Sequence, residues 1–301
     1  MCDLTAKYFQ DADKAREHLE SLRWPDGPFC PHCGSTKKPM KLEGKTCRSG
    51  LYKCSEYKCR KQFSVTVGTV MERSKVPLNK WLLAVHLMCS SKKGISAHQI
   101  HRMLGVTYKT AWFMCHRIRE AMHDDGVPLG GNGGTVEADE TFWGNNKPKG
   151  QKKGRGYHHK MKVLSLVDRN GKKRSFKVDR VNAETLKPYL EQHVRPDSHL
   201  MTDEHAGYTL IGRKFASHGI VKHGQAEYAN GLINTNSAES SFALLKRGLR
   251  GIFHHVGEQH LQRYVTEFDF RWNFRVKNGF DDKERAAALL SQIGGKRLTY
   301  A

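Results

Sequence analysis

Three acidic residues, far apart in the chain, are of the type and setting needed for chemistry on a phosphodiester. Asp139 lies in a strand-like run, Asp203 ends a later strand-like run, and Glu239 lies near the start of a helical segment. Cutting or joining a phosphodiester requires charge to be neutralised on the attacking and leaving oxygens, which two Mg²⁺ ions bridged by carboxylates can do. Such a site gathers its acids from distant chain positions, so these three are candidate catalytic residues and magnesium ligands.

Two of these acids also have a purely structural interpretation. Asp203 could cap a helix that begins near Glu204, and the run Asn236-Ser-Ala-Glu239 resembles a capping box. Helical spacing argues against the second alternative, because it places Glu239 on a face that points inward or toward a cleft. The other members of that face are Phe242, Lys246 and Leu249.

The first strand leaves two acids open. Side chains of a strand point alternately to its two faces. One face of the run Thr135–Trp143 therefore carries Glu137, Asp139 and Thr141, and the other carries Val136, Ala138, Glu140 and Phe142. The pattern alone does not choose between Asp139 and Glu140.

Basic residues gather around these acids in the sequence and are candidate contacts to DNA phosphates. One group extends the helix of Glu239 and consists of Lys246, Arg247 and Arg250. The other is the segment 147–160, which has five Lys, one Arg and no acid. Its candidate DNA-binding residues are Lys147, Lys149, Lys152, Lys153 and Arg155.

Four of the eight cysteines form two close pairs, Cys30-x2-Cys33 and Cys54-x4-Cys59. Zn²⁺ in a structural site takes four such ligands in a tetrahedron. The second pair begins 21 residues after the first ends, a separation typical of a zinc ribbon, and Gly34 permits the tight turn beside the sulfurs. His32 is a rival ligand, but its position inside the first pair makes it a poor fourth corner. We expect the remaining cysteines to be core or incidental thiols.

Two helices joined by a glycine turn are predicted between residues 95 and 119. Ile95–Leu104 has helical spacing, Gly105-Val106 supplies the turn, and Thr107 can cap the second helix. A helix-turn-helix presents the start of its second helix to the major groove of DNA. The candidate DNA-contacting residues are Tyr108, Lys109 and Thr110, with Arg117 and Arg119 further along. The alternative is an ordinary helical hairpin packed through Ile100, Leu104, Ala111 and Ile118.

Composition bounds the partners and the compartment. The net charge of +21 and the pI of about 9.7 predict a polyanionic partner. The longest apolar run, Trp81–Cys89, is too short to span a bilayer, and residues 1–5 lack the pattern of a secretory signal. We therefore expect a cytoplasmic protein with no membrane partner, in which paired cysteines bind metal instead of forming disulfides.

Composition shifts predict an α+β multidomain chain. We expect an N-terminal helix over 1–25, a zinc ribbon over 26–70 with a strand-like run at 63–67, a helix-turn-helix segment over 71–123, a glycine-rich linker over 124–134 and a C-terminal domain over 135–295. In the last of these, strand-like runs at 135–143, 162–167 and 174–178 precede a helix near 183–194 and a run at 199–203. This order predicts a mixed sheet flanked by helices.

Several motifs together resemble the ISXO-like transposases of bacterial insertion sequences, over about residues 25 to 275. The motifs in the N-terminal half are Cys30-Pro-His-Cys-Gly34, Gly68-Thr-Val-Met-Glu-Arg-Ser-Lys75 followed by Trp81, Lys93-Gly-Ile-Ser96, Thr110-Ala-Trp-Phe113 and His116-Arg-Ile-Arg119. Those in the C-terminal half are Val136-Glu-Ala-Asp-Glu-Thr141, Thr202-Asp-Glu-His-Ala-Gly-Tyr208, Asn234-Thr-Asn-Ser-Ala-Glu-Ser240 and Leu245-Lys-Arg-Gly-Leu-Arg-Gly251.

The resemblance implies an RNase H-like α/β core and a DDE triad at Asp139, Asp203 and Glu239. It favours Asp139 over Glu140, and the 35 residues between Asp203 and Glu239 match a spacing shared by many DDE recombinases. It also implies a DNA transposase that binds terminal inverted repeats, cuts the element ends and joins them to target DNA. We expect Mg²⁺ or Mn²⁺ at the triad, structural Zn²⁺ at the cysteines, a homodimer or higher multimer on double-stranded DNA, and association with the bacterial nucleoid.

Two other functions share many of these features. One is an RNase H-like nuclease or resolvase that performs no strand transfer, and the other is a non-catalytic, sequence-specific DNA-binding regulator. An intact triad argues against the regulator, whereas joined products on DNA with cut ends would separate a transposase from a nuclease.

Overall fold

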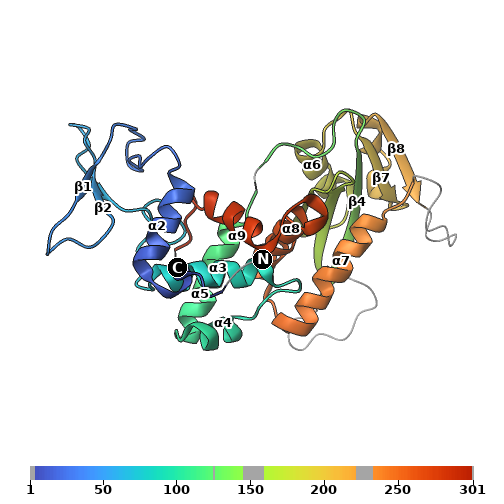
Figure 1. Cartoon of the computed structure of the whole chain (residues 1–301). Coiled ribbons are helices and arrows are strands. Elements are labelled where there is room, and N and C mark those ends of the chain that lie inside the picture. The colour runs from blue at the N-terminus through green and yellow to red at the C-terminus, as the bar shows by residue number, and fades with distance from the viewer. Residues whose placement is uncertain (1–3, 125, 145–158, 222–232, 300–301) are drawn as a thin grey trace. The chain divides into compact units, whose positions relative to one another are not determined.

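The computed structural model describes residues 4–124, 126–144, 159–221 and 233–299. The chain divides into two compact units, one formed by Met1–His123 with Gly279–Ala301 and the other by Asp124–Asn278. Each unit is described by itself below, and Figure 1 labels the elements of both.

Two short helices open the first unit, α1(Lys7–Gln10) and α2(Ala12–Arg23). Asp11 caps α2, because its Oδ1 accepts a hydrogen bond of 2.8 Å from the backbone N–H of Lys14. Ala15 and Leu19 are fully buried on the inner face of α2. The expected single helix over 1–25 is therefore two helices that meet at Asp11.

A small antiparallel sheet follows, with the strand order β1(Met40–Leu42), β2(Leu51–Lys53) and β3(Gln62–Phe63). The expected strand over 63–67 is wrong beyond Phe63, because residues 65–68 form turns. Val65 is nevertheless 1% exposed. Its apolar character thus reflects burial in a turn, which a short apolar run cannot distinguish from a strand.

Four helices complete the first unit: α3(Leu78–Ser90), α4(Ala97–Leu104), α5(Tyr108–Ala121) and α9(Asp282–Ser291). Gly105 ends α4 in the left-handed conformation, with φ of 58°, and Thr107 caps α5. The predicted helix-turn-helix boundaries are therefore close to the observed ones. Helix α9 packs against α2 and α3, so residues 279–295, which we expected in the C-terminal domain, lie in the first unit.

The second unit is built on a five-stranded mixed sheet with the order β6-β5-β4-β7-β8. Its strands are β4(Thr135–Trp143), β5(Met161–Asp168), β6(Lys173–Val178), β7(His199–Asp203) and β8(Ser217–Val221). The first three pair antiparallel, whereas β7 and β8 add parallel to β4 and to each other. Helix α6(Ala183–His193) connects β6 to β7, and α7(Asn236–Gly248) and α8(Leu261–Asn273) follow the sheet. This is the RNase H-like arrangement expected from the sequence.

Short helical turns connect these elements. They are η1(Ala206–Tyr208), η2(Gly212–Lys214), the π-helical turn η4(Leu249–Phe253), η5(Glu258–His260) and η6(Val276–Asn278). Among the described residues, none of the helices has both the length and the hydropathy needed to cross a membrane.

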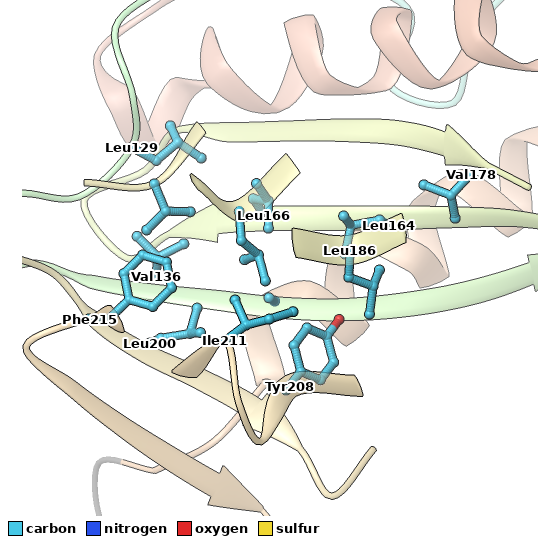
Figure 2. Packing of buried hydrophobic residues seen from close by; sticks show 13 residues of the cluster. Leu129, Val136, Leu164, Leu166, Val178, Leu186, Leu200, Tyr208, Ile211 and Phe215 are labelled. Carbon is cyan, nitrogen blue, oxygen red and sulfur yellow. The ribbon is translucent and has the colours of Figure 1, made fainter. Parts of the chain in front are cut away.

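Hydrophobic clusters cover both faces of this sheet. On one face, Leu186 of α6 packs with Leu200 and Tyr208 (Figure 2). On the other face, Leu245 of α7 and residues of α8 pack against Val163. Full burial of one such leucine stabilises the fold by about 1.5–3 kcal/mol. Since α7 and α6 cover opposite faces, alternate side chains of β4 point toward one or the other helix.

The glycine-rich segment 124–134 belongs to the second unit, and Leu129 packs into the core of that unit. Leu129 is 4% exposed within the cluster of Figure 2, and its N–H donates to the His193 carbonyl at 2.8 Å. Gly130 has φ of 75°, and a Cβ there would lie 2.2 Å from Ser198 Oγ. Glycine is therefore required for close packing here, which differs from the free linker expected over the whole segment.

Candidate active site and metal centre

The four paired cysteines form one cluster beside the small sheet. Their sulfurs all lie within 4.8 Å of one another, with Cys30 Sγ 3.8 Å from Cys59 Sγ and Cys33 Sγ 3.7 Å from Cys54 Sγ. A zinc ion with Zn–S bonds of about 2.3 Å sits in a tetrahedron whose S–S edges are about 3.8 Å. The spacing of the sulfurs thus fits a structural zinc ion.

The other candidate ligands lie outside this cluster. His32 Nε2 contacts the carbonyl of Gln62 at 3.2 Å, so its ring has a backbone partner. Cys89 and Cys115 are fully buried in the helical part of the unit, and Cys47 is exposed. Among the described residues, the cluster therefore consists of the four paired cysteines.

The register of β4 and β7 brings two of the predicted acids level. Glu137 pairs with Met201 across these parallel strands. Two residues further along, Asp139 and Asp203 point to the same face, because side chains alternate. One ligand oxygen from each of Asp139, Glu140 and Asp203 lies within 4.8 Å of the other two. Two strands distant in sequence thus bring carboxylates into one group.

Glu140 is the member of this group that sequence reasoning left out of the site. It comes from the opposite face of β4, where its Oε1 accepts a hydrogen bond from the hydroxyl of Tyr208. Tyr208 is fully buried in the cluster of Figure 2, and burial raises its pKa well above the ordinary value. The hydroxyl therefore keeps its proton and fixes the Glu140 carboxyl. The only sequence signal for Glu140 was its position next to Asp139.

Burial makes this group hard to ionise without a compensating positive charge. Burial raises the pKa of Asp139 to about 7, and the charges of Asp203 and Glu239 act in the same direction. Burial likewise raises the pKa of Glu140 to about 8, helped by Asp203 and Asp139. Lys246 and the backbone N–H of Glu140 lower the pKa of Asp139 without reversing its shift. Carboxylates this close are typical of a divalent cation site.

A buried carboxylate, Glu137, fixes the start of α7. Its Oε2 accepts hydrogen bonds from the backbone N–H groups of Ser237 and Ala238, at 2.8 and 3.0 Å. Its Oε1 accepts a bond of 2.9 Å from Arg169 Nε, and Arg169 Nη2 also donates to the carbonyl of Asn234 at 3.0 Å. Thr235, the N-cap, makes no side-chain cap bond, so the strand supplies the cap. This role of Glu137 has no local signal in the sequence, because its partner lies 100 residues away.

Glu239 lies on the first turn of α7, just beyond this attachment. The charge of Glu239 raises the pKa of Asp139. Glu239 is therefore near enough to act electrostatically on the carboxylate group. It is exposed, however, and is not among the acids that lie within 4.8 Å of one another. The capping box proposed as an alternative role is not formed. Nor does Asp203 cap a helix at Glu204, since its Oδ1 accepts the N–H of His205 in a turn.

The basic candidates of α7 and its extension lie at different distances from the acids. Lys246 acts electrostatically on Asp139. Arg247 is exposed and donates to the carbonyl of Ala243 in its own helix. Arg250 is exposed, with its guanidinium 5.8 Å from the ring centre of Trp143. The predicted contacts Lys147, Lys149, Lys152, Lys153 and Arg155 lie outside the described residues.

The start of α5 carries the predicted DNA contacts as an exposed group, apart from Arg117. Tyr108 is 44% exposed and stacks on His98 at 4.1 Å, and Lys109 is also exposed. Thr110 is half-buried, with its Oγ1 2.8 Å from that of Thr107. Arg117 is only 6% exposed.

Arg117, which we expected among the DNA-contacting residues further along α5, is buried in the first unit. Its guanidinium lies 5.5 Å from the ring centres of both Trp81 and Phe113, and its Nη2 donates to the carbonyl of Glu72 at 2.6 Å. Arg119 is also buried, at 3% exposed. Arginine is rarely buried without a partner, so the sequence alone favours a surface position for Arg117. The partners that bury it are distant in sequence.

Comparison with known families gives two matches, one over most of the second unit and one over the N-terminal part of the first unit. Residues 131–273 match the model of the ISXO2-like transposase domain, and residues 10–62 match the model of a transposase zinc-ribbon domain. The first match contains all of the acids described above. It ends before Gly279, where the chain returns to the first unit.

One curated relative and two solved structures are also similar. An uncharacterised protein in the transposable element ISH50 of Halobacterium salinarum is 27% identical, over 88% of this chain and 92% of that protein. Chains of the Mos1 strand transfer complex and of a pre-cleavage Mos1 transpososome are each 14% identical. They cover 66% and 64% of this chain and 78% and 74% of theirs, both with a TM-score of 0.22.

Proposed function

Because the chain belongs to the ISXO2-like transposases, we propose that Asp139, Asp203 and Glu239 are its catalytic triad and that it cuts and joins DNA in a metal-dependent reaction. The observation that carries this proposal is the group of carboxylates at the β4–β7 register, where ligand oxygens lie within 4.8 Å. Glu239 is added through α7, whose start is tied to Glu137 on the same face of β4 as Asp139.

The donor set fits magnesium or manganese. Carboxylate oxygens are the ligands these ions prefer, and a pKa of about 7 at Asp139 means that a nearby cation is needed to keep the buried acids ionised together. Asp139, Asp203 and Glu239 would together hold a pair of such ions. When bound, such a pair neutralises charge on the attacking and leaving oxygens of an in-line displacement.

The chain's own residues would position the DNA for two successive displacements. Water would attack the phosphodiester at the element end, and the 3′-hydroxyl released there would attack target DNA, without a covalent enzyme intermediate. Lys246, which acts on Asp139 electrostatically, would lie beside the reacting phosphate. Arg247 and Arg250, which are both exposed, would contact flanking phosphates.

The zinc ribbon and the exposed start of α5 would recognise the terminal inverted repeats. The net charge of +21 supports binding that weakens steeply with salt. Two ends must be joined in one reaction, so we propose a homodimer or higher multimer on double-stranded DNA. Tyr108, Lys109 and Thr110 would supply the base contacts of each copy.

The test is a cleavage and joining assay with Mg²⁺ on duplexes that carry the DNA flanking the gene for this chain. The Asp203→Asn variant should bind these duplexes like the unchanged protein and cut them at least a hundredfold more slowly. Glu204→Gln is the matched control, because it removes the neighbouring exposed carboxylate, and it should cut normally. Normal cutting by Asp203→Asn would refute the triad. Cut ends that are never joined would identify a nuclease, and binding without cutting a regulator.

A further inference from the structure

A basic cavity lies in the first unit, between the segment 73–76 and helix α5. Its volume is about 330 Å³. Among the described residues that line it, four are basic and none is acidic. The basic residues are Arg73, Lys75, Lys109 and Arg117, and the aromatic walls are Trp81 and Phe113.

The wall formed by residues 72–76 is fixed to the helices. Arg117 Nη2 donates to the Glu72 carbonyl at 2.6 Å, and Trp81 Nε1 donates to Ser74 Oγ at 2.9 Å. Ser74 Oγ also accepts the N–H of Val76 at 3.1 Å. Because side chains of α3 and α5 hold this segment, the cavity is preformed and is not a gap between loose loops.

Arg117 places a buried positive charge at the base of the cavity. It is 6% exposed, and its Nε has no hydrogen-bond partner among the described residues. Burial lowers its pKa, opposed by Glu72, yet a guanidinium stays protonated. A buried cation with an unused N–H is stabilised by an anion that approaches from the open side.

The rim of the cavity is positive and solvent-accessible. Arg73 and Lys75 are exposed on the loop, and Lys109 is exposed at the start of α5. Glu72 is an acid beside this rim, with Oε1 3.8 Å from Arg73 Nε and Oε2 accepting the N–H of Gly68 at 3.2 Å. An ion pair of this length with an exposed arginine contributes little to stability. The charge of Arg73 is therefore available to a ligand.

We propose that this cavity binds one backbone phosphate of the DNA duplex that α5 contacts, with Arg73, Lys75 and Lys109 around the phosphate and Arg117 behind it. The inference rests on the proposed DNA-binding role of α4 and α5. Helix-turn-helix proteins hold their register on the duplex through phosphate contacts beside the second helix. Lys109 belongs both to the cavity and to the exposed start of α5. A phosphate bound in the cavity would therefore lie next to the DNA major groove that α5 enters.

The first test is the salt dependence of binding by the full-length chain to an unrelated duplex. The double variant Arg73→Gln/Lys75→Gln should weaken binding and reduce the slope of log K against log salt by about 0.9 for the lost phosphate contact. The matched control, Lys7→Gln/Lys14→Gln, removes the same charge from exposed positions of α1 and α2. Equal slopes for the two double variants would overturn the proposal.

The second test locates the phosphate on the element-end duplex, in which single phosphates are replaced by neutral methylphosphonates. At one position, neutralisation should weaken binding by the unchanged protein but have almost no further effect on Arg73→Gln/Lys75→Gln. Additive losses at every position would overturn the cavity as a phosphate site. If the unchanged protein does not prefer the element end, the proposed recognition of repeats fails, whereas the salt test on unrelated DNA still decides the cavity.

Discussion

Replacing Asp139 by asparagine should make the metal-free protein more stable at pH 8 while abolishing its activity. In the folded protein, burial and then the charges of Asp203 and Glu239 raise the pKa of Asp139 from 3.8 to about 7. The ionised carboxyl is therefore less favourable in the folded chain than in the unfolded chain, and this destabilises the fold at pH 8. Asparagine has a similar shape and can still accept the N–H of Glu140, a bond of 2.7 Å, but it carries no charge.

The sign and size follow from linkage. Between pH 4 and 7 the folded state holds a proton on Asp139 that the unfolded state has released. The free energy of unfolding therefore falls as pH rises through this window. The stabilisation that protonated Asp139 contributes is fully present below the unfolded pKa of 3.8 and is lost at about pH 7. At about 1.36 kcal/mol for each tenfold change in proton affinity, the loss is about 4 kcal/mol. For a domain of this size that corresponds to roughly 8–16 °C in Tm.

The assay is thermal unfolding of the full-length chain at pH 5 and pH 8, with zinc retained and with or without Mg²⁺. Without Mg²⁺, Asp139→Asn should exceed the unchanged protein in Tm at pH 8 by several degrees, and the difference should shrink at pH 5. Mg²⁺ should raise the Tm of the unchanged protein more at pH 8 and should hardly affect the variant. Asp179→Asn, an exposed position in the same unit, should show neither effect. A variant less stable than the unchanged protein at pH 8 would refute the reasoning.

Three further changes have defined outcomes. Cys54→Ser should release the zinc and unfold the small sheet, measured as zinc content and loss of hydrogen-exchange protection in β1 and β2, because structural zinc contributes on the order of 10 kcal/mol. Glu137→Gln should lower the free energy of unfolding by about 1.5–3 kcal/mol, measured by denaturant titration, since a neutral amide accepts weaker hydrogen bonds than the carboxylate does from Arg169 and from the start of α7. Tyr208→Phe should raise the pKa of Glu140 above about 8, since the hydroxyl bond lowers it. Half-saturation of cleavage by Mg²⁺ should then shift to higher metal concentration at pH 8.

Each of these predictions has a control or a result that would contradict it. Cys47→Ser changes an exposed thiol outside the cluster and should keep the zinc. For Glu137→Gln, a free energy of unfolding equal to that of the unchanged protein would mean that α7 is held by other contacts. For Tyr208→Phe, an unchanged metal requirement at pH 8 would show that Glu140 does not influence the site.

Local patterns predicted the elements that carry the acids, because those patterns are set by neighbours in sequence. Thr135–Trp143 and His199–Asp203 were expected as strands and are β4 and β7. The cap at Thr107 and the cysteine pairs also follow from local spacing. In each case the determining partner is within a turn, a strand period or a short loop.

Features set by distant partners could not be predicted. Arg117 is buried because Trp81 and the Glu72 carbonyl lie beside it. Glu137 caps a helix 100 residues away, and the amphipathic helix α9 gives no local indication that it packs with α2 and α3. Charged residues in particular are assigned to the surface unless a partner is known, and that partner is supplied only by the fold.

The most direct test of the triad is the anomalous X-ray signal of Mn²⁺ in crystals of the full-length chain bound to an element-end duplex. We expect two peaks, both touching Asp139, one also in contact with Asp203 and the other with Glu239. Peaks coordinated by Asp139, Glu140 and Asp203 that leave Glu239 without contact to metal would contradict the proposed triad.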